Sequence, residues 1–91
     1  MSVLLVIYEI SDLQKRSKIV GSLRKRYRIS VKLTESVYAI YTDLLPVRIF
    51  DHVKQYLDGD DQLYVVPITR PFTGYGPRHT TEWLNDCLTT G

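Results

Sequence analysis

The order of hydrophobic periodicities along the chain is the feature that most restricts its fold. Residues 3–9 form an apolar run rich in β-branched side chains, which predicts a buried strand. Elsewhere, alternation with a period of two predicts strands, and apolar spacings of three and four predict helices. The later elements are a helix from residue 13 to about 27, strands at 28–33 and 36–42, a helix from Pro46 to Gly59, and a strand at 62–68.

The order strand-helix-strand-strand-helix-strand is that of the split-βαβ or ferredoxin-like motif. It predicts an α+β fold in which two helices pack on one face of a four-stranded antiparallel sheet. Residues 1–68 would form this core, and residues 69–91 a C-terminal extension with a Gly- and Pro-rich loop. We expect a short helix in the extension, capped by Thr80 and carrying Trp83, Leu84, Cys87 and Leu88.

Composition restricts the class of protein. A chain of 91 residues predicts one domain, and its single cysteine, Cys87, cannot form an internal disulfide, which favours the reducing cytoplasm. No apolar stretch approaches the length of a membrane span, and the sequence lacks a cationic leader with a cleavage site, so we expect no membrane partner. Residues 1–45 hold eight basic and four acidic residues, against four and six in 46–91, so a local basic surface is expected.

The first strand predicts a second buried face. In a sheet covered by helices on one side only, strands alternate between apolar and polar residues. Here both faces of the strand are apolar, with Val3, Leu5 and Ile7 on one and Leu4, Val6 and Tyr8 on the other. Either the 69–91 extension or a second copy would cover the remaining face, and we expect a homodimer. Four tyrosines would be buried in that interface rather than stack on bases: Tyr8, Tyr38, Tyr41 and Tyr64.

Both helices have an apolar side, and the first also has a basic side. We expect an apolar arc of Leu13, Val20, Leu23 and Tyr27 in the first helix, and one of Val47, Phe50, Val53 and Leu57 in the second. The opposite side of the first helix carries Lys15, Lys18, Lys25 and Arg26. Such a stripe suits phosphate contacts, although a solvated helix face has the same pattern. Arg16 projects into the apolar arc, where it either snorkels or reaches the carboxylate end of the first strand. In the second case it would make a functional contact near Glu9 or with phosphate.

Three segments resemble the CRISPR-associated adaptation proteins of the Cas two family. The opening "VLLVIYEISDLQKRSKIVGSLRKRY" is similar to the family's apolar strand, short cap and basic helix start. The matching residues there are Tyr8, Glu9, Ile10, Ser11, Asp12, Lys15, Arg16 and Lys18. Two later strands match at Ser36, Val37 and Tyr38, and at Asp61, Leu63, Tyr64 and Pro67. The resemblance covers about residues 1–68 and includes none of the extension.

The resemblance implies a nucleic-acid-binding homodimer. Dimers of the Cas two family hold duplex DNA by its backbone while a partner integrase cuts and joins it in spacer acquisition, and some members are metal-dependent nucleases of RNA or DNA. On this reading Lys15, Arg16, Lys18, Lys25 and Arg26 would contact nucleic acid.

Glu9 is the candidate catalytic residue and magnesium ligand. The family has Asp at this position, one from each subunit, whereas Glu carries its carboxylate outward by about one bond length. Magnesium demands a strict geometry, so this change favours a binding scaffold over a weak endonuclease. Two other functions stay open: a protein-interaction module that binds no nucleic acid, and a toxin-like ribonuclease on a related fold.

Overall fold

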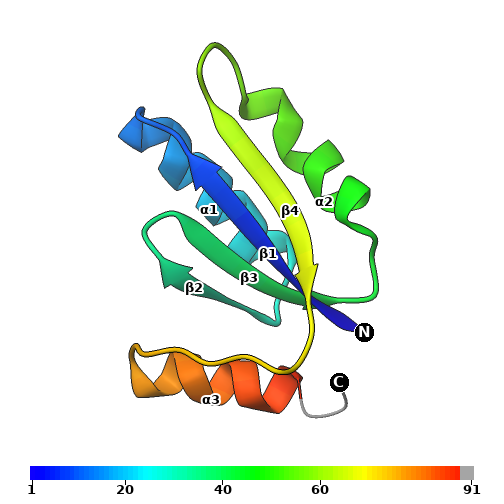
Figure 1. The fold of residues 1–91 in the computed structure, drawn as a ribbon. Coiled ribbons are helices and arrows are strands. Elements are labelled where there is room, and N and C mark those ends of the chain that lie inside the picture. Colours follow the sequence, from blue (N-terminus) through cyan, green and yellow to red (C-terminus); the bar gives the residue numbers. More distant parts are fainter. Residues whose placement is uncertain (89–91) are drawn as a thin grey trace.

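The computed structural model describes residues 1–88. Strands and helices follow one another in the predicted order, with a third helix in the extension (Figure 1). The strands are β1 (Ser2–Glu9), β2 (Ser30–Thr34), β3 (Val37–Thr42) and β4 (Gln62–Ile68). The helices are α1 (Leu13–Arg26), α2 (Pro46–Val53), a 3-10 turn (Lys54–Tyr56) and α3 (Arg78–Cys87).

The four strands form one antiparallel sheet in the order β2-β3-β1-β4. β1 lies in the interior of the sheet, where Leu4 pairs with Ile40 of β3 on one side and with Pro67 of β4 on the other. Pro67 lacks an N–H, and it lies in an edge strand, as its chemistry requires. The predicted ferredoxin-like α+β fold is therefore confirmed.

The main core lies between the sheet and the first two helices. Even-numbered residues of β1, such as Leu4 and Val6, face α1 and α2 and are buried. α1 contributes Ile19 and Leu23, and α2 contributes Ile49 and Val53.

The predicted apolar arcs are confirmed in part: Leu23, Tyr27 and Val53 are buried, and Val20 and Leu57 pack against the core. Leu13 is 66% exposed and Val47 is 56% exposed, whereas Ile19 and Ile49 are fully buried. The orientation of each helix on the sheet decides which of its residues are buried. A residue at the margin of the arc expected from the sequence, such as Ile19, can therefore face the sheet.

The C-terminal extension covers part of the second face of the sheet. Leu88, directly after α3, packs with Val3 of β1 and Ala39 of β3. Around them are partly buried side chains from the strands, the loop and α3: Leu5, Val31, Leu33, Tyr41, Ile68, Phe72, Trp83, Leu84 and Cys87. Cys87 is thus a packed thiol, and burial raises its pKa. For this part of the second face, the predicted alternative in which the extension covers the sheet is the one observed.

The other part of the second face is open. Ile7, Tyr64 and Val66 are exposed on β1 and β4, where Ile7 is the cross-strand neighbour of Tyr64. We call these three residues the open sheet patch. Because α3 lies at one end of the sheet (Figure 1), the patch remains at the end where β1 finishes.

Several local predictions were wrong. Tyr8 and Tyr38 are buried under α1 and α2 rather than on the second face, because even-numbered positions of β1 and β3 face the helices. α3 begins at Arg78 with Pro77 as its N-cap, so Thr80 lies inside the helix and does not cap it. α2 ends at Val53, because residues 54–56 tighten into a 3-10 turn. In residues 1–88, no helix has the length and apolar character needed to cross a membrane.

Candidate functional site

Glu9 ends β1 on the second face of the sheet. Its neighbour across the sheet is Gln62 of β4, and its side chain is exposed. Because side chains alternate along a strand, Glu9 points to the same side as Ile7 of the open sheet patch. The predicted catalytic carboxylate therefore lies beside the uncovered apolar surface and away from the helix-side core.

A cavity of about 440 Å³ opens where β1 ends and α1 begins. It is rich in carboxylates, but most of them already have partners. Asp12 caps α1, since its Oδ1 accepts hydrogen bonds from the backbone N–H groups of Gln14 at 2.9 Å and Lys15 at 3.1 Å. The acidic residues that line the cavity are Glu9, Asp12, Asp58, Asp60 and Asp61.

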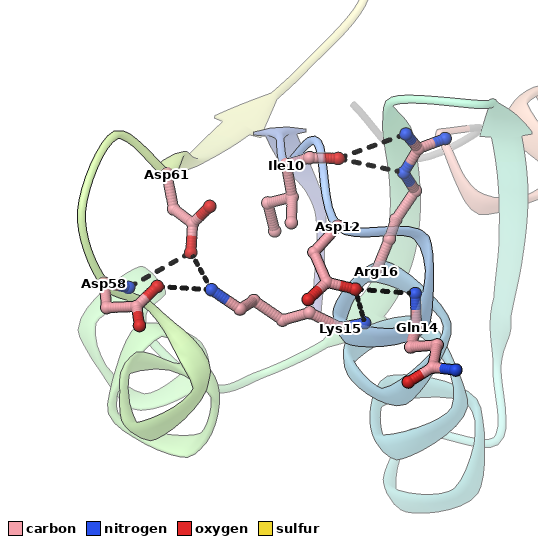
Figure 2. Close-up of polar contacts among 7 residues, drawn as sticks. All are labelled: Ile10, Asp12, Gln14, Lys15, Arg16, Asp58 and Asp61. Carbon is pink, nitrogen blue, oxygen red and sulfur yellow. Dashed lines mark hydrogen bonds and ion pairs between the residues drawn. The ribbon is translucent and has the colours of Figure 1, made fainter.

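Lys15 forms ion pairs with two of these carboxylates. Its Nζ donates to Asp61 Oδ2 at 2.6 Å and also to Asp58 Oδ1, as Figure 2 shows. The hydrogen bond to Asp58, followed by that to Asp61, raises the pKa of Lys15. In turn the Lys15 ammonium, followed by the Asp58 backbone N–H at 3.0 Å, lowers the pKa of Asp61. Gly59 has a φ of +54°, a value that favours glycine, and it allows the turn that brings both aspartates to Lys15.

Arg16 also reaches this end of the sheet. Its Nε and Nη2 donate to the Ile10 carbonyl oxygen at 3.3 and 3.1 Å (Figure 2). The guanidinium is thus anchored just after β1 by a neutral acceptor, so its charge is not neutralised there. This is one of the two positions that the sequence predicted for Arg16, although the contact is to backbone and not to Glu9.

The other predicted nucleic-acid-binding residues lie along the outer side of α1. Lys18, Lys25 and Arg26 are all exposed. Lys18 and Lys25 are seven residues apart, which places them on one side of the helix, about 10 Å apart along its axis. Neither lysine forms an ion pair with any residue in the described part of the chain. Lys15, by contrast, has turned away from this stripe to bind two aspartates.

Among the described residues, no three His, Cys, Asp or Glu side chains form a group that could hold a metal ion. One oxygen each of Asp12, Asp58 and Asp61 is engaged in the cap or the ion pairs, whereas Glu9 and Asp60 form no ion pair in the described part of the chain.

Sequence reasoning missed four residues around α1. Asp58 and Asp61 belong to the "DGDD" turn, and although Asp61 matches the Cas two family, neither residue was predicted to pair with Lys15. Arg24 and Lys32 line a separate cavity with Arg16 on the helix side of the sheet. The alternation of β2 could have located Lys32. Its apolar residues face α3, so its polar residues Ser30 and Lys32 lie on the opposite side of the sheet, which is the side of α1.

One solved structure gives an independent view of the fold. The crystal structure of a hypothetical protein from Thermus thermophilus matches with a TM-score of 0.67 and 29% sequence identity, over 84% of this chain and 94% of that one. No model of a known protein family matches the chain, and no curated protein does. The comparison supports the fold over nearly the whole of the Thermus protein. The comparison does not indicate a function, because the Thermus protein is itself described as hypothetical.

Proposed function

We propose that this protein is a homodimer that binds duplex nucleic acid by its backbone. Following its resemblance to the Cas two family, the dimer would hold DNA in the cytoplasm for a partner integrase during CRISPR spacer acquisition. The observation that carries the proposal is the pair Lys18 and Lys25, exposed on one side of α1 and without carboxylate partners in the described part of the chain. Cations in this state attract phosphates without reading sequence.

The ion pairs of Lys15 make this stripe shorter than the sequence predicts. Lys15 and its two partners, Asp58 and Asp61, together carry a net negative charge, so this group does not attract phosphate. Lys18, Lys25 and Arg26 would therefore carry the contact, while Arg16, fixed to the Ile10 carbonyl, adds positive charge at the N-terminal end of α1. The proposed interface is the outer side of α1 from Lys18 onward.

The open sheet patch supports the dimer. Tyr64 is 64% exposed, and its neighbour Ile7 adds apolar surface next to it. A second copy with the same patch would cover both at once, because a two-fold interface joins identical surfaces. Glu9 lies on this face, so the dimer would bring two Glu9 carboxylates toward the symmetry axis.

A weak, magnesium-dependent nuclease activity depends on this dimer. The described residues of one subunit hold no group of three candidate metal ligands, whereas two Glu9 side chains with bound waters match the ligands magnesium uses. In that case Glu9→Gln, which keeps the side-chain length and removes the charge, abolishes cleavage. Cleavage that survives in Glu9→Gln and ignores chelation of magnesium would show that Glu9 has no such role.

The binding proposal is tested by fluorescence anisotropy with a labelled DNA duplex at low salt. Lys18→Glu/Lys25→Glu should weaken binding strongly. The control is Arg48→Glu in α2 combined with Lys54→Glu in the 3-10 turn, which changes the net charge equally at two exposed positions outside the interface, although Lys54 pairs with Asp51 at 3.3 Å. Equal losses in both double variants would mean that net charge alone, and not the α1 surface, drives the association.

The open sheet patch also favours a second candidate function, a protein-interaction module. An exposed apolar surface beside a structured extension suits a protein partner as well as a second copy. This candidate predicts no duplex binding even at about 50 mM salt, where phosphate contacts are strong. The anisotropy measurement therefore separates the two functions.

A further inference from the structure

A second cavity, of about 420 Å³, opens on the helix side of the sheet between α1 and the β2–β3 hairpin. Its volume is within the range of pockets that hold small molecules. The polar side chains in its wall are those of Tyr8, Arg16, Ser17, Arg24, Lys32 and Glu35. Neither Lys18 nor Lys25, the residues that carry the proposed function, lines it.

The cavity is positively charged. Three cations face one carboxylate, and the Glu35 carboxylate pairs with Lys32 Nζ at 3.1 Å. Arg16 donates to a neutral carbonyl, and Arg24 forms no ion pair within residues 1–88. Two guanidinium groups thus keep their full charge, and each can bind a planar or tetrahedral oxyanion through paired N–H groups.

A buried hydroxyl without a partner lies at the same place. Tyr8 is 1% exposed, and its Oη has no hydrogen-bond partner among the described residues. Tyr38 is buried to the same degree, but its hydroxyl is 2.8 Å from Ser30 Oγ and is satisfied. Buried polar groups are nearly always paired, so the Tyr8 hydroxyl is a donor that a ligand atom or a water molecule would satisfy.

Charged residues of the cavity wall act on Tyr8. Burial raises the pKa of Tyr8, the Arg16 charge lowers it, and the Glu35 charge raises it. Tyr8, Arg16 and Glu35 all line the same cavity. A tyrosine with a raised pKa keeps its proton at neutral pH and can donate a hydrogen bond to an anion.

Gly21 is part of the cavity wall. It lies in α1, at a sequence position between Arg16 and Arg24, where glycine is less favourable than alanine. A Cβ atom at Gly21 would meet no atom within 4 Å, so packing inside the chain does not require glycine there. A long side chain at this position would extend from the wall into the open space.

We propose that this cavity binds a phosphate monoester, with the dianion between Arg16 and Arg24 and one oxygen accepting the Tyr8 hydroxyl proton. Two unneutralised cations match the two charges of such a group. Leu13 and Val20, which also line the cavity, supply an apolar wall for the organic part of the ligand. The proposal does not depend on duplex binding through Lys18 and Lys25.

Isothermal titration calorimetry with adenosine monophosphate tests the site, with adenosine and sodium sulfate as comparison ligands. We expect saturable binding of the monophosphate and none of adenosine. Tyr8→Phe should weaken binding by about 10-fold, the effect of losing one hydrogen bond to a charged group. Binding of sulfate as tight as that of the monophosphate would overturn the proposal, because it would show a general anion effect.

Gly21 provides a matched pair of variants. Gly21→Met fills the cavity and should abolish binding, whereas Gly21→Ala keeps the space and should retain it; both replace glycine in the helix and should fold. Equal affinity in the two variants would place the ligand elsewhere.

Competition with 5′-phosphorylated and 5′-hydroxyl oligonucleotides then identifies the molecule that carries the phosphate monoester. Selective displacement of adenosine monophosphate by the phosphorylated strand indicates the end of a nucleic-acid strand, and no displacement by either strand indicates a free nucleotide.

Discussion

Lys15 of α1 and Asp61, just before β4, form an ion pair of 2.6 Å in which the side chains are 20% and 9% exposed (Figure 2). The pair joins the first turn of α1 to the turn that leads into an edge strand, 46 residues later in the chain. A cation that the sequence places in a nucleic-acid interface therefore has a structural role. The expected interface moves along α1 to Lys18 and Lys25.

The ion pair predicts how stability depends on pH. The pKa of Asp61 is lower in the folded chain than in the unfolded one, where it is about 3.9. The pair therefore stabilises the fold above that value, and its contribution is lost as the pH falls through the folded-state pKa. In urea denaturation, Asp61→Asn should unfold more easily than the wild type at pH 7, and the difference should shrink below about pH 4.

Asp60→Asn is the control for this measurement. Asp60 lies in the same turn but is exposed and forms no ion pair in the described part of the chain. Its substitution should leave stability at pH 7 unchanged. If Asp60→Asn and Asp61→Asn behaved alike, the pairing with Lys15 would contribute nothing to folding.

The two buried tyrosines predict opposite effects of removing a hydroxyl. Tyr8→Phe removes an unpaired buried group and should stabilise the ligand-free protein by about 1 kcal/mol. Tyr38→Phe removes the hydrogen bond with Ser30 and should cost about 1 kcal/mol. Thermal and urea denaturation measure both changes, and a loss of stability in Tyr8→Phe would show that its hydroxyl has a partner.

The extension predicts a local unfolding step. Leu88 is buried against Val3 and Ala39, so Leu88→Ala should cost about 2–4 kcal/mol. Trp83 of α3 is the chain's single tryptophan and packs at the same cluster, so its fluorescence reports whether α3 is docked. In Leu88→Ala, Trp83 emission should shift to longer wavelength at lower urea than the loss of helical circular dichroism. Coincident transitions would mean that α3 unfolds only with the core.

The open sheet patch predicts the oligomeric state. Sedimentation of the wild type at micromolar concentration should show a dimer, and Tyr64→Glu should show a monomer because it places a charge in the apolar interface. Tyr75→Glu is the control, since Tyr75 is fully exposed in the loop before α3. A wild type that sediments as a monomer would contradict the dimer.

The sequence predicted the fold better than the site. Periodicity was enough to find six elements and their order, because apolar residues at fixed spacing report burial directly. Thr80 was misplaced as a cap because Ser and Thr also occur inside helices, and nothing in the pattern marks Pro77 as the start. The pairs of Lys15 with Asp58 and Asp61 join residues more than 40 positions apart. These ion pairs depend on tertiary structure, because they require β4 to lie beside β1, and no local sequence pattern predicts them.

The salt dependence of duplex binding tests the central claim most directly. For the wild type, the logarithm of the binding constant should fall linearly with the logarithm of salt concentration. Each phosphate contact that is lost reduces the slope by about 1, so Lys18→Ala/Lys25→Ala should reduce its magnitude by about 2. The control, Arg48→Ala in α2 combined with Lys54→Ala in the 3-10 turn, should leave the slope unchanged. An identical slope in the wild type and the α1 variant would contradict the proposed interface.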